Sequence, residues 1–430
     1  MDSGLGIGGF SHNVQETTSS KLDLFSPIVL DHGIKERHDI EVRPQTISDG
    51  NGPVEFIIHP DEDKFTDPQS MAISGRVAIM KKVNDKWVLT DTQMQSDLAL
   101  TKNFFQSLWS SVIIKVQNQD IGDLNNMSYP YSTYLQSMLG ARSPMRNTLL
   151  SEDGYDAYVL RSGSYTDFEI ELKNDVNNCI KYLPPGVKLS VILRRSPDSF
   201  MFAFKNDDMK VEDYKIDIQD LCLKITKYTP DDNVMSYFEK EKKKSPPYTL
   251  YTRNVLKTYT STKGSYDLTA YNLFHGNALP NRIYVTLVDQ AAFGGNPKLK
   301  SLQFQPHEIS EISLIVNNVR IPSKPLTYQE GVDEASMYRA FLYNTGTSHH
   351  EMDSVMISKK EYFANKFVVA FDLSKTRDNG LYTHKPMRGS MSVCIKTRKA
   401  LEKNVMILVY ASYDSVLTFI DDKVVTDIMI

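Results

Sequence analysis

The chain has 430 residues, of which 41% are hydrophobic and 24% charged, and its formal net charge is −4. This composition is typical of a globular protein and excludes a collagen, a coiled coil or a largely disordered chain. The near-neutral balance argues against a protein that coats nucleic acid, because that function depends on a surplus of lysine and arginine to neutralise phosphates.

Residues 1–21 are rich in Gly, Ser, Thr and Asn and poor in apolar side chains, which predicts a mobile N-terminal arm. Gly4, Gly6 and Gly9 have the spacing of a dinucleotide-binding loop, but no strand precedes them, so a flexible arm is the better interpretation. The arm lacks the cationic start and apolar run of a secretory signal. No segment of the chain approaches the ~18 apolar residues of a membrane span, and we expect none.

From residue 54 onward, short segments rich in β-branched and aromatic residues predict β-strands. Residues 168–172 alternate apolar and acidic side chains, as a strand with one solvent-facing side does. Residues 200–204 fit either a strand or an aromatic loop. The other predicted strands are 54–58, 71–80, 87–89, 187–193, 214–225, 248–259, 282–288, 312–321, 367–373, 390–396 and 405–413. The predicted fold class is therefore all-β.

The best candidate helix begins at Pro130, a favoured first helical position, and ends at Gly140. Its apolar stripe predicts one buried face. The stripe consists of Tyr131, Tyr134, Leu135, Met138 and Leu139. Residues 98–109 and 334–342 are weaker candidates for helices.

A charged segment ending in Ser-Pro-Pro, residues 237–247, predicts a boundary near the middle of the chain, because proline pairs suit neither a helix nor a central strand. Its lysines could form a nuclear-import or nucleic-acid patch, but the interleaved glutamates favour a solvated connector. The predicted organisation is an arm at 1–21, one domain at 22–236, the connector, and a second domain at 248–430.

The two halves resemble each other at an offset of 200 residues. Residues 111–121 and 311–321 share Val, Asn and Ile at three of eleven positions, and each is an apolar strand followed by an Asn turn. Each also precedes a candidate helix, which contains Tyr134 in the first half and Tyr338 in the second. The shared order of strand, turn and helix indicates a tandem duplication.

Two polar clusters resemble metal sites but fit them poorly. Residues 349–353 contain two histidines and two acidic residues, but they lack the i, i+4 spacing of a zinc helix, and an exposed loop is favoured. Residues 59–63 are acidic but lack the glycine and final glutamate of a calcium loop, and a charged turn is favoured. We predict no metal site and no cofactor.

Catalytic patterns are equally weak. Cys179, Cys222 and Cys394 lie far apart in the sequence, without a nearby histidine, and each is expected to be a small buried residue. Glu169 and Glu171 share one strand face like the two carboxylates of a glycosidase, but the exposed alternation of that strand explains them without chemistry. We predict no catalytic residue and no enzymatic activity.

A series of short phrases resembles the double jelly-roll major capsid proteins of Polinton (Maverick) elements and adintoviruses. The phrases occur in that family's order and extend over residues 22–420. They are LDLFS at 22–26, GPVEF at 52–56, YPYSTY at 129–134, NLFHG at 272–276, LPNRI at 279–283, LVD at 287–289, IPSKP at 321–325, AFDL at 370–373 and VYA at 409–411.

The resemblance implies two tandem eight-stranded jelly rolls with short helical insertions in the loops. It also implies a homotrimer that forms a pseudo-hexameric capsomer, an icosahedral shell around double-stranded DNA, and penton and minor capsid proteins as partners. The chain would then reside in the virion, without sequence-specific nucleic-acid binding. In that setting the candidate helix lies at a trimer or capsomer contact, formed by Tyr131, Tyr134, Leu135 and Met138.

One alternative is a jelly-roll carbohydrate-binding protein or glycoside hydrolase, because that class shares the β-sandwich architecture. Only Trp87 and Trp109 could stack on sugars, and both adjoin apolar runs, which predicts buried positions for them. A second alternative is a scaffolding or minor virion protein. The tandem halves disfavour it, because a penton-type protein is expected to have one jelly roll per chain.

Overall fold

The computed structural model describes most of the chain. The described residues are 32–45, 52–92, 98–122, 127–140, 146, 148–156, 158–204, 209–345, 357–375, 387–420 and 423–428. The predicted arm at 1–21 with its glycine motif, the phrase at 22–26 and the histidine cluster at 349–353 lie outside these residues.

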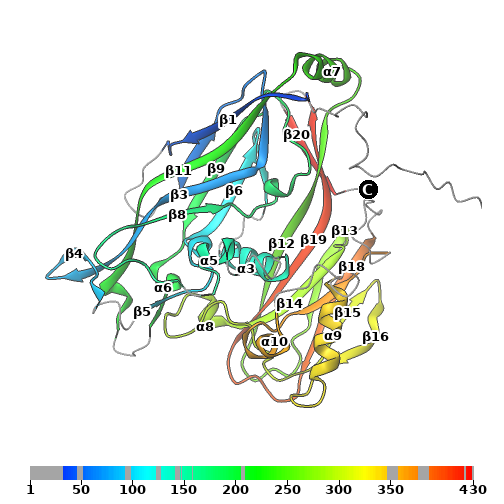
Figure 1. The fold of residues 1–430 in the computed structure, drawn as a ribbon. Coiled ribbons are helices and arrows are strands. Elements are labelled where there is room, and N and C mark those ends of the chain that lie inside the picture. Colours follow the sequence, from blue (N-terminus) through cyan, green and yellow to red (C-terminus); the bar gives the residue numbers. More distant parts are fainter. Residues whose placement is uncertain are drawn as a thin grey trace, which may run out of the picture.

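Eight strands of the first half form two antiparallel sheets around one hydrophobic core (Figure 1). Numbered along the chain, they pair in the orders 1-8-3-6 and 2-7-4-5. The first sheet contains β1 (Ile34–Val42), β11 (Tyr214–Pro230), β3 (Phe65–Val83) and β8 (Thr166–Glu171). The second contains β2 (Val54–Ile58), β9 (Leu189–Arg195), β6 (Trp109–Val116) and β7 (Gln119–Ile121). This strand order is that of a jelly roll.

The second half repeats the same two orders around its own core. One sheet contains β12 (Tyr248–Ser261), β19 (Val405–Ile420), β14 (Arg282–Asp289) and β17 (Val369–Asp372). The other contains β13 (Ala270–Ala278), β18 (Arg388–Thr397), β15 (Ile309–Val316) and β16 (Val319–Thr327). The predicted fold of two tandem eight-stranded jelly rolls is therefore confirmed.

The internal repeat corresponds to the same hairpin in each half. Residues 111–121 fall in β6, a short turn and β7, and residues 311–321 fall in β15, a turn and β16. In the second turn, Asn317 and Asn318 both have positive φ angles, of 49° and 65°. Asparagine tolerates this region of backbone space, which two-residue hairpin turns require.

Short helices lie in the loops between the strands, and two of them match predictions. Helix α3 (Ser128–Gly140) joins β7 to β8, and α9 (Glu334–Asn344) occupies the equivalent place between β16 and β17. The remaining helices are α2 (Phe104–Ser107), α5 (Leu149–Glu152), α6 (Asp198–Met201), α7 (Asp232–Lys242), α8 (Gln290–Phe293) and α10 (Lys359–Asn365), with single 3-10 turns η1 (Val176–Asn178) and η2 (Val211–Asp213). In the described part of the chain, no helix is both long and apolar enough to cross a bilayer.

The helix predicted at residues 98–109 is wrong. This segment contains β5 (Leu98–Leu100), the single turn of α2 and the start of β6. Strand β5 pairs with β10 (Phe202–Phe204), and Asn103 takes a left-handed conformation before α2. Pairing with a distant strand therefore overrides the local apolar pattern. Residues 237–247 begin within α7, whose last turns carry the charges of the expected connector.

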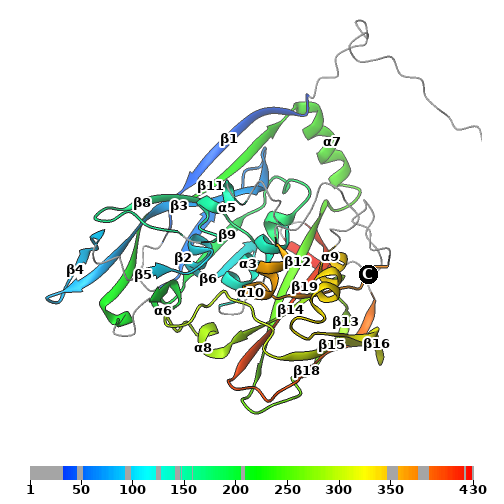
Figure 2. The same cartoon turned by 60° about the horizontal axis from the view of Figure 1, so that its bottom comes forward.

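The two jelly rolls lie side by side (Figures 1 and 2). Helix α7 lies at one end of the molecule, and α8, α9 and α10 lie toward the opposite end (Figure 1). Two further strands extend the sheets: β4 (Lys86–Leu89) pairs with β3, and β20 (Lys423–Ile428) pairs with β19. Helix α3 lies between the halves, which makes their junction the place to look for a functional site.

Candidate functional site

Helix α3 belongs to the first half but buries most of its apolar face in the core of the second. Tyr131, Tyr134, Leu135 and Met138 are fully buried and belong to the same cluster as the inner residues of β14 and β19. Tyr129, at the start of the helix, packs into the core of the first half instead. A single helix thus contributes to both cores.

The tyrosines of α3 make specific contacts across the junction. The Tyr131 hydroxyl donates a hydrogen bond to the backbone carbonyl of Ser301 at 3.0 Å, and its ring stacks on Phe293 with the centroids 4.8 Å apart. The Tyr134 ring lies 5.7 Å from Phe304 of the second half and stacks on Tyr155 of its own half at 5.2 Å. Burial raises the pKa of both hydroxyls well above the ordinary value, so both stay protonated.

The sequence analysis expects Tyr131, Tyr134, Leu135 and Met138 at a contact between chains. In the structure all four are fully buried within the single chain, in a cluster made mainly of residues of the second half and also containing Tyr155 and Phe200 of the first. The apolar stripe predicts that this helix face is covered, and it is. The stripe does not predict what covers it, because one apolar surface serves a domain junction and a subunit contact equally well.

The second half also contributes to the core of the first. Tyr251, Leu417, Phe419 and Val424 are buried in the first core. Backbone hydrogen bonds cross the junction from the Ile180 amide to the Leu250 carbonyl at 2.9 Å and from the Phe204 amide to the Pro297 carbonyl at 2.8 Å. Because the halves exchange core residues, they pack as one block.

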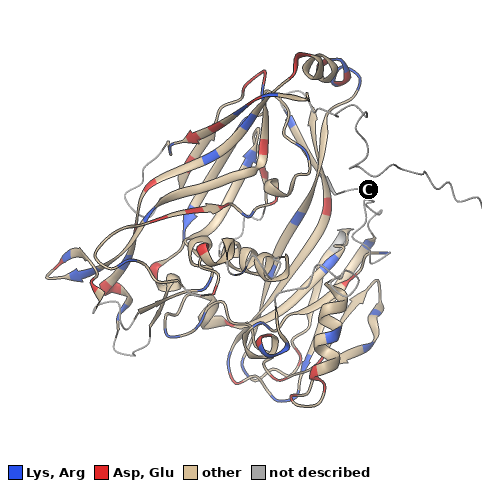
Figure 3. Ribbon diagram, viewed as in Figure 1, with Lys and Arg blue, Asp and Glu red and all other residues tan. Residues whose placement is uncertain are grey.

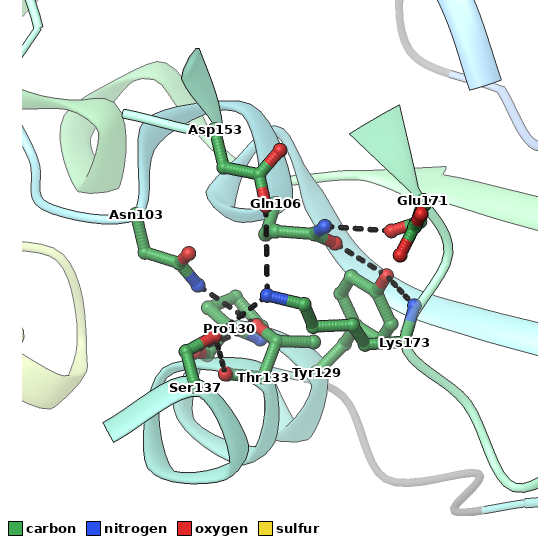
Figure 4. Close-up of polar contacts among 9 residues, drawn as sticks. All are labelled: Asn103, Gln106, Tyr129, Pro130, Thr133, Ser137, Asp153, Glu171 and Lys173. Carbon is green, nitrogen blue, oxygen red and sulfur yellow. Dashed lines mark hydrogen bonds and ion pairs between the residues drawn. The ribbon is translucent and has the colours of Figure 1, made fainter. Parts of the chain in front are cut away.

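A buried polar cluster surrounds Lys173 beside α3 (Figure 4). The Lys173 ammonium donates to the Ser137 hydroxyl at 2.6 Å and lies 3.5 Å from a carboxylate oxygen of Asp153. The two charged side chains are only 17% and 12% exposed. Burial lowers the pKa of Lys173 and raises the pKa of Asp153, since removal from water disfavours both charged forms.

Further hydrogen bonds connect this cluster to the loops on either side of α3 (Figure 4). The Tyr129 hydroxyl donates to the Gln106 side chain at 2.7 Å, and the Gln106 amide donates to the Glu171 backbone carbonyl at 2.8 Å. The Asn103 amide donates to the Thr133 hydroxyl at 3.0 Å. These bonds hold α3 against α2 and the end of β8.

A lysine and a carboxylate with shifted pKa values can also indicate catalysis. The hollow beside them has a cavity volume of only about 40 Å³ and is lined by groups that include Lys173, Asp175, Asn254 and Tyr410. Sites for small molecules usually have volumes of ~300 Å³ or more. The Lys173 ammonium is also already bonded to Ser137. We therefore assign the cluster to packing of the junction.

A second polar group, half-buried around Arg146 and Glu361, ties the halves together. The Arg146 guanidinium lies 2.7 Å from an Asp156 oxygen and 2.8 Å from a Glu361 oxygen on α10. The Lys366 ammonium is 3.7 Å from Glu361. Burial alone would raise the pKa of Glu361, but the Ser358 backbone amide and the Arg146 guanidinium bond to its carboxylate and lower the pKa to about 2.

The carboxylate-rich segments singled out in the sequence have structural partners. In the 59–63 segment, the Asp61 carboxylate accepts a hydrogen bond from the buried Lys227 ammonium at 2.6 Å. Strand β8 alternates buried and exposed residues, and Glu169 on its exposed face pairs with Lys224 at 2.6 Å. Among the described residues, no group of three or more His, Cys, Asp or Glu could hold a metal ion.

The burial predicted for the cysteines and tryptophans is confirmed for some of these residues and wrong for others. Cys179 and Cys222 are buried as expected, whereas Cys394 is half-buried, and burial raises the pKa of all three thiols. Trp109 is 1% exposed, as predicted. The burial predicted for Trp87 is wrong, since it is 38% exposed on the hairpin of β3 and β4. The apolar neighbours of Trp87 form this hairpin rather than a core.

Comparison with known proteins supports the architecture. No protein-family model matches the chain. "Uncharacterized protein F54H12.2" of Caenorhabditis elegans is 20% identical over 346 residues, which are 73% of this chain and 78% of that protein. Among solved structures, a chain of the Sputnik virophage aligns with a TM-score of 0.64 at 12% identity, covering 97% of this chain and 94% of its own.

Two further structures give the same result. The mavirus major capsid protein aligns over 100% of this chain and 96% of its own, with a TM-score of 0.56 and 12% identity. A chain of the PBCV-1 virus capsid aligns over 94% of this chain and 98% of its own, with a TM-score of 0.63 and 9% identity. At these identities the likeness establishes the fold: the chain has the double jelly-roll fold of viral major capsid proteins.

Proposed function

We propose that this chain is a major capsid protein that forms homotrimers and, from them, an icosahedral shell around a double-stranded DNA genome. The observation that carries the proposal is the presence of two jelly rolls with identical strand order, packed into one block. The likeness of the whole chain to virophage and viral capsid chains supports the proposal.

The arrangement suits a pseudo-hexagonal building block. Three chains with two similar barrels each provide six barrels around a threefold axis. Repeated heterologous contacts between a first and a second barrel can then close into a ring. The shared cores and the Arg146 bridge to Glu361 would fix the angle between the barrels of each chain. A fixed angle keeps the ring regular, as an ordered lattice requires.

The charge distribution fits a shell that encloses DNA without condensing it. Acidic and basic residues are interspersed over the strands of both halves (Figure 3), and the formal net charge is −4. Tight electrostatic binding of a duplex needs clustered lysine and arginine. We therefore assign packaging to other proteins, and we expect penton and minor capsid proteins as further partners in the virion.

The ordered phrases in the sequence favour a finer placement, among the major capsid proteins of Polinton elements and adintoviruses. We propose the same domain organisation as in the sequence analysis, with jelly rolls at 22–236 and 248–430 joined through 237–247. The role is structural, without catalysis. Burial of Trp109 removes one of the two indoles that a sugar-binding site could use, which weighs against the carbohydrate-binding alternative.

The mass of the purified full-length protein tests the proposed assembly. Size-exclusion chromatography with light scattering should give a particle of three times the 48.9 kDa of the single chain. The particle should keep this mass on dilution into the low micromolar range. A monomer at every concentration and salt condition would contradict the proposal.

A further inference from the structure

The hairpin formed by β3 and β4 extends beyond the body of the first jelly roll. Strand β11 pairs with β3 only as far as Lys81, so Lys82 and Val83 pair with β4 alone. The turn between the strands consists of Asn84 and Asp85, both with positive φ angles. Figures 1 and 2 both show β4 at the left extremity of the molecule.

Near its tip the hairpin exposes apolar side chains. Trp87 and Val88 are 38% and 39% exposed, and Val83 is 37% exposed. The contact of Trp87 that the structure shows is with the Lys215 ammonium, 5.1 Å from the ring centre. Two-stranded ribbons are marginally stable in water, and exposed apolar groups on a projecting element mark a contact surface. The hairpin therefore has the properties of an element that a partner covers.

A surface with the opposite charge and an exposed apolar residue lies on the second jelly roll. Residues 329–334, which lie between β16 and the first residue of α9, contain Glu330, Asp333 and Glu334 but no lysine or arginine, and Glu334 pairs with Lys359 of α10 at 3.1 Å. Val332, between these acidic residues, is 67% exposed. The hairpin tip has the opposite balance, with Lys81, Lys82 and Lys86 against Asp85, which pairs with Lys82 at 3.0 Å. The two surfaces are complementary in charge, and each presents an apolar centre.

One chain cannot bring these two surfaces together. The hairpin is at the left extremity of the molecule, and β16 lies on the right in both views (Figures 1 and 2). Contact between them therefore needs a second copy of the chain. A head-to-tail contact of this kind joins two different surfaces, and it generates a ring when the rotation closes.

We propose that the β3–β4 hairpin of one chain docks on the 329–334 loop of a neighbouring copy and is the principal first-to-second barrel contact of the trimer. Trp87 is the apolar anchor, since buried tryptophans at interface centres account for much of the binding energy. Lys82 lies opposite Trp87 in the hairpin register, shares its face and sets the orientation against the acidic loop, while Lys86, opposite Val83, adds positive charge from the other face. This inference rests on the proposed function, because it names the contact that would join the capsomer.

Charge reversal in both directions tests the pairing. Lys82→Glu with Lys86→Glu should raise the concentration at which trimers dissociate by about tenfold or more, since like charges then face each other. Glu330→Lys with Asp333→Lys should weaken trimers similarly. Combining all four changes should restore most of the affinity, which simple damage to either surface would not do. Trp87→Ser should dissociate trimers at concentrations where the wild type is assembled.

Lys240→Glu with Lys243→Glu, two exposed positions at the C-terminal end of α7, is the matched control and should leave trimers intact. A thermal melt of each variant shows that the fold is retained, because the altered side chains are exposed or half-buried at the surface. If the hairpin and loop variants form trimers of wild-type stability, the inference is overturned while the proposed function stands. If the wild type itself stays monomeric, both are overturned.

Discussion

At the scale of single residues, the junction depends on a few charged groups with restricted access to water. The Glu361 carboxylate accepts hydrogen bonds from the Ser358 amide at 3.1 Å and the Ser358 hydroxyl at 2.9 Å, and it pairs with Arg146 of the first half. These donors lower its pKa to about 2, from an ordinary value of 4.5. The charged form therefore stabilises the folded chain wherever Glu361 would be ionised in the unfolded chain.

This shift predicts a pH-dependent contribution to stability. Because the folded-state pKa is lowered, the contribution is complete above pH 4.5 and is lost as the pH falls toward about 2. Glu361→Gln should lower the free energy of unfolding by about 2 kcal/mol at pH 7. The difference from the wild type should vanish near pH 2. Urea unfolding at a series of pH values measures both quantities.

The matched control is Glu402→Gln, at an exposed position before β19. It removes the same charge from the chain and should change stability by no more than ~0.5 kcal/mol. If the free energy of unfolding of Glu361→Gln differed from that of the wild type by the same amount at every pH, the effect of Glu361 would come from packing of its side chain and not from its charge.

At the scale of secondary-structure elements, α3 is the helix that bridges the two cores. Its stripe of Tyr131, Tyr134, Leu135 and Met138 packs with residues of the second half, while Tyr129 packs in the first. Large buried side chains at such a position stabilise both halves at once. Loss of them should therefore lower the stability of the whole chain rather than only its tendency to associate.

The double variant Tyr134→Ala with Leu135→Ala distinguishes the two roles. We expect the free energy of unfolding to fall by at least about 4 kcal/mol, because each truncation leaves a cavity in a packed core. Ser132→Ala, half-buried on the same helix, should change stability by less than ~1 kcal/mol. Normal stability of the double variant combined with loss of trimers would contradict this and favour a contact between chains.

Elements differed in how far the sequence could predict them. Helices α3 and α9 and most strands have periodic apolar faces, so local pattern suffices. Helix α7 has no buried residue, and its charges indicated a connector instead. Strand β1 was missed because its residues are mostly charged and exposed. The segment at 98–109 failed because β5 depends on β10, about a hundred residues later in the chain.

The site was less predictable than the fold, because its contacts join residues that are far apart in the sequence. Arg146 and Glu361 lie far apart in the sequence, and no local signal connects them. The buried pair of Lys173 and Asp153 likewise gives no periodic pattern. The exposure of Trp87 could have been anticipated from Asn84 and Asp85, because adjacent Asn and Asp between two strands favour a tight hairpin.

At the scale of the whole molecule, two jelly rolls of the same strand order share core residues across one junction. The proposed lattice subunit requires such a repeat of two barrels at a fixed angle. The exposed hairpin on one barrel and the acidic loop on the other place complementary surfaces at opposite sides of this block.

Electron microscopy of the expressed full-length protein tests the central claim most directly. The account predicts particles with threefold symmetry and a pseudo-hexagonal outline, six barrels in each, together with closed spherical shells at high concentration. Isolated two-barrel particles without threefold symmetry, under all conditions of salt and concentration, would contradict it.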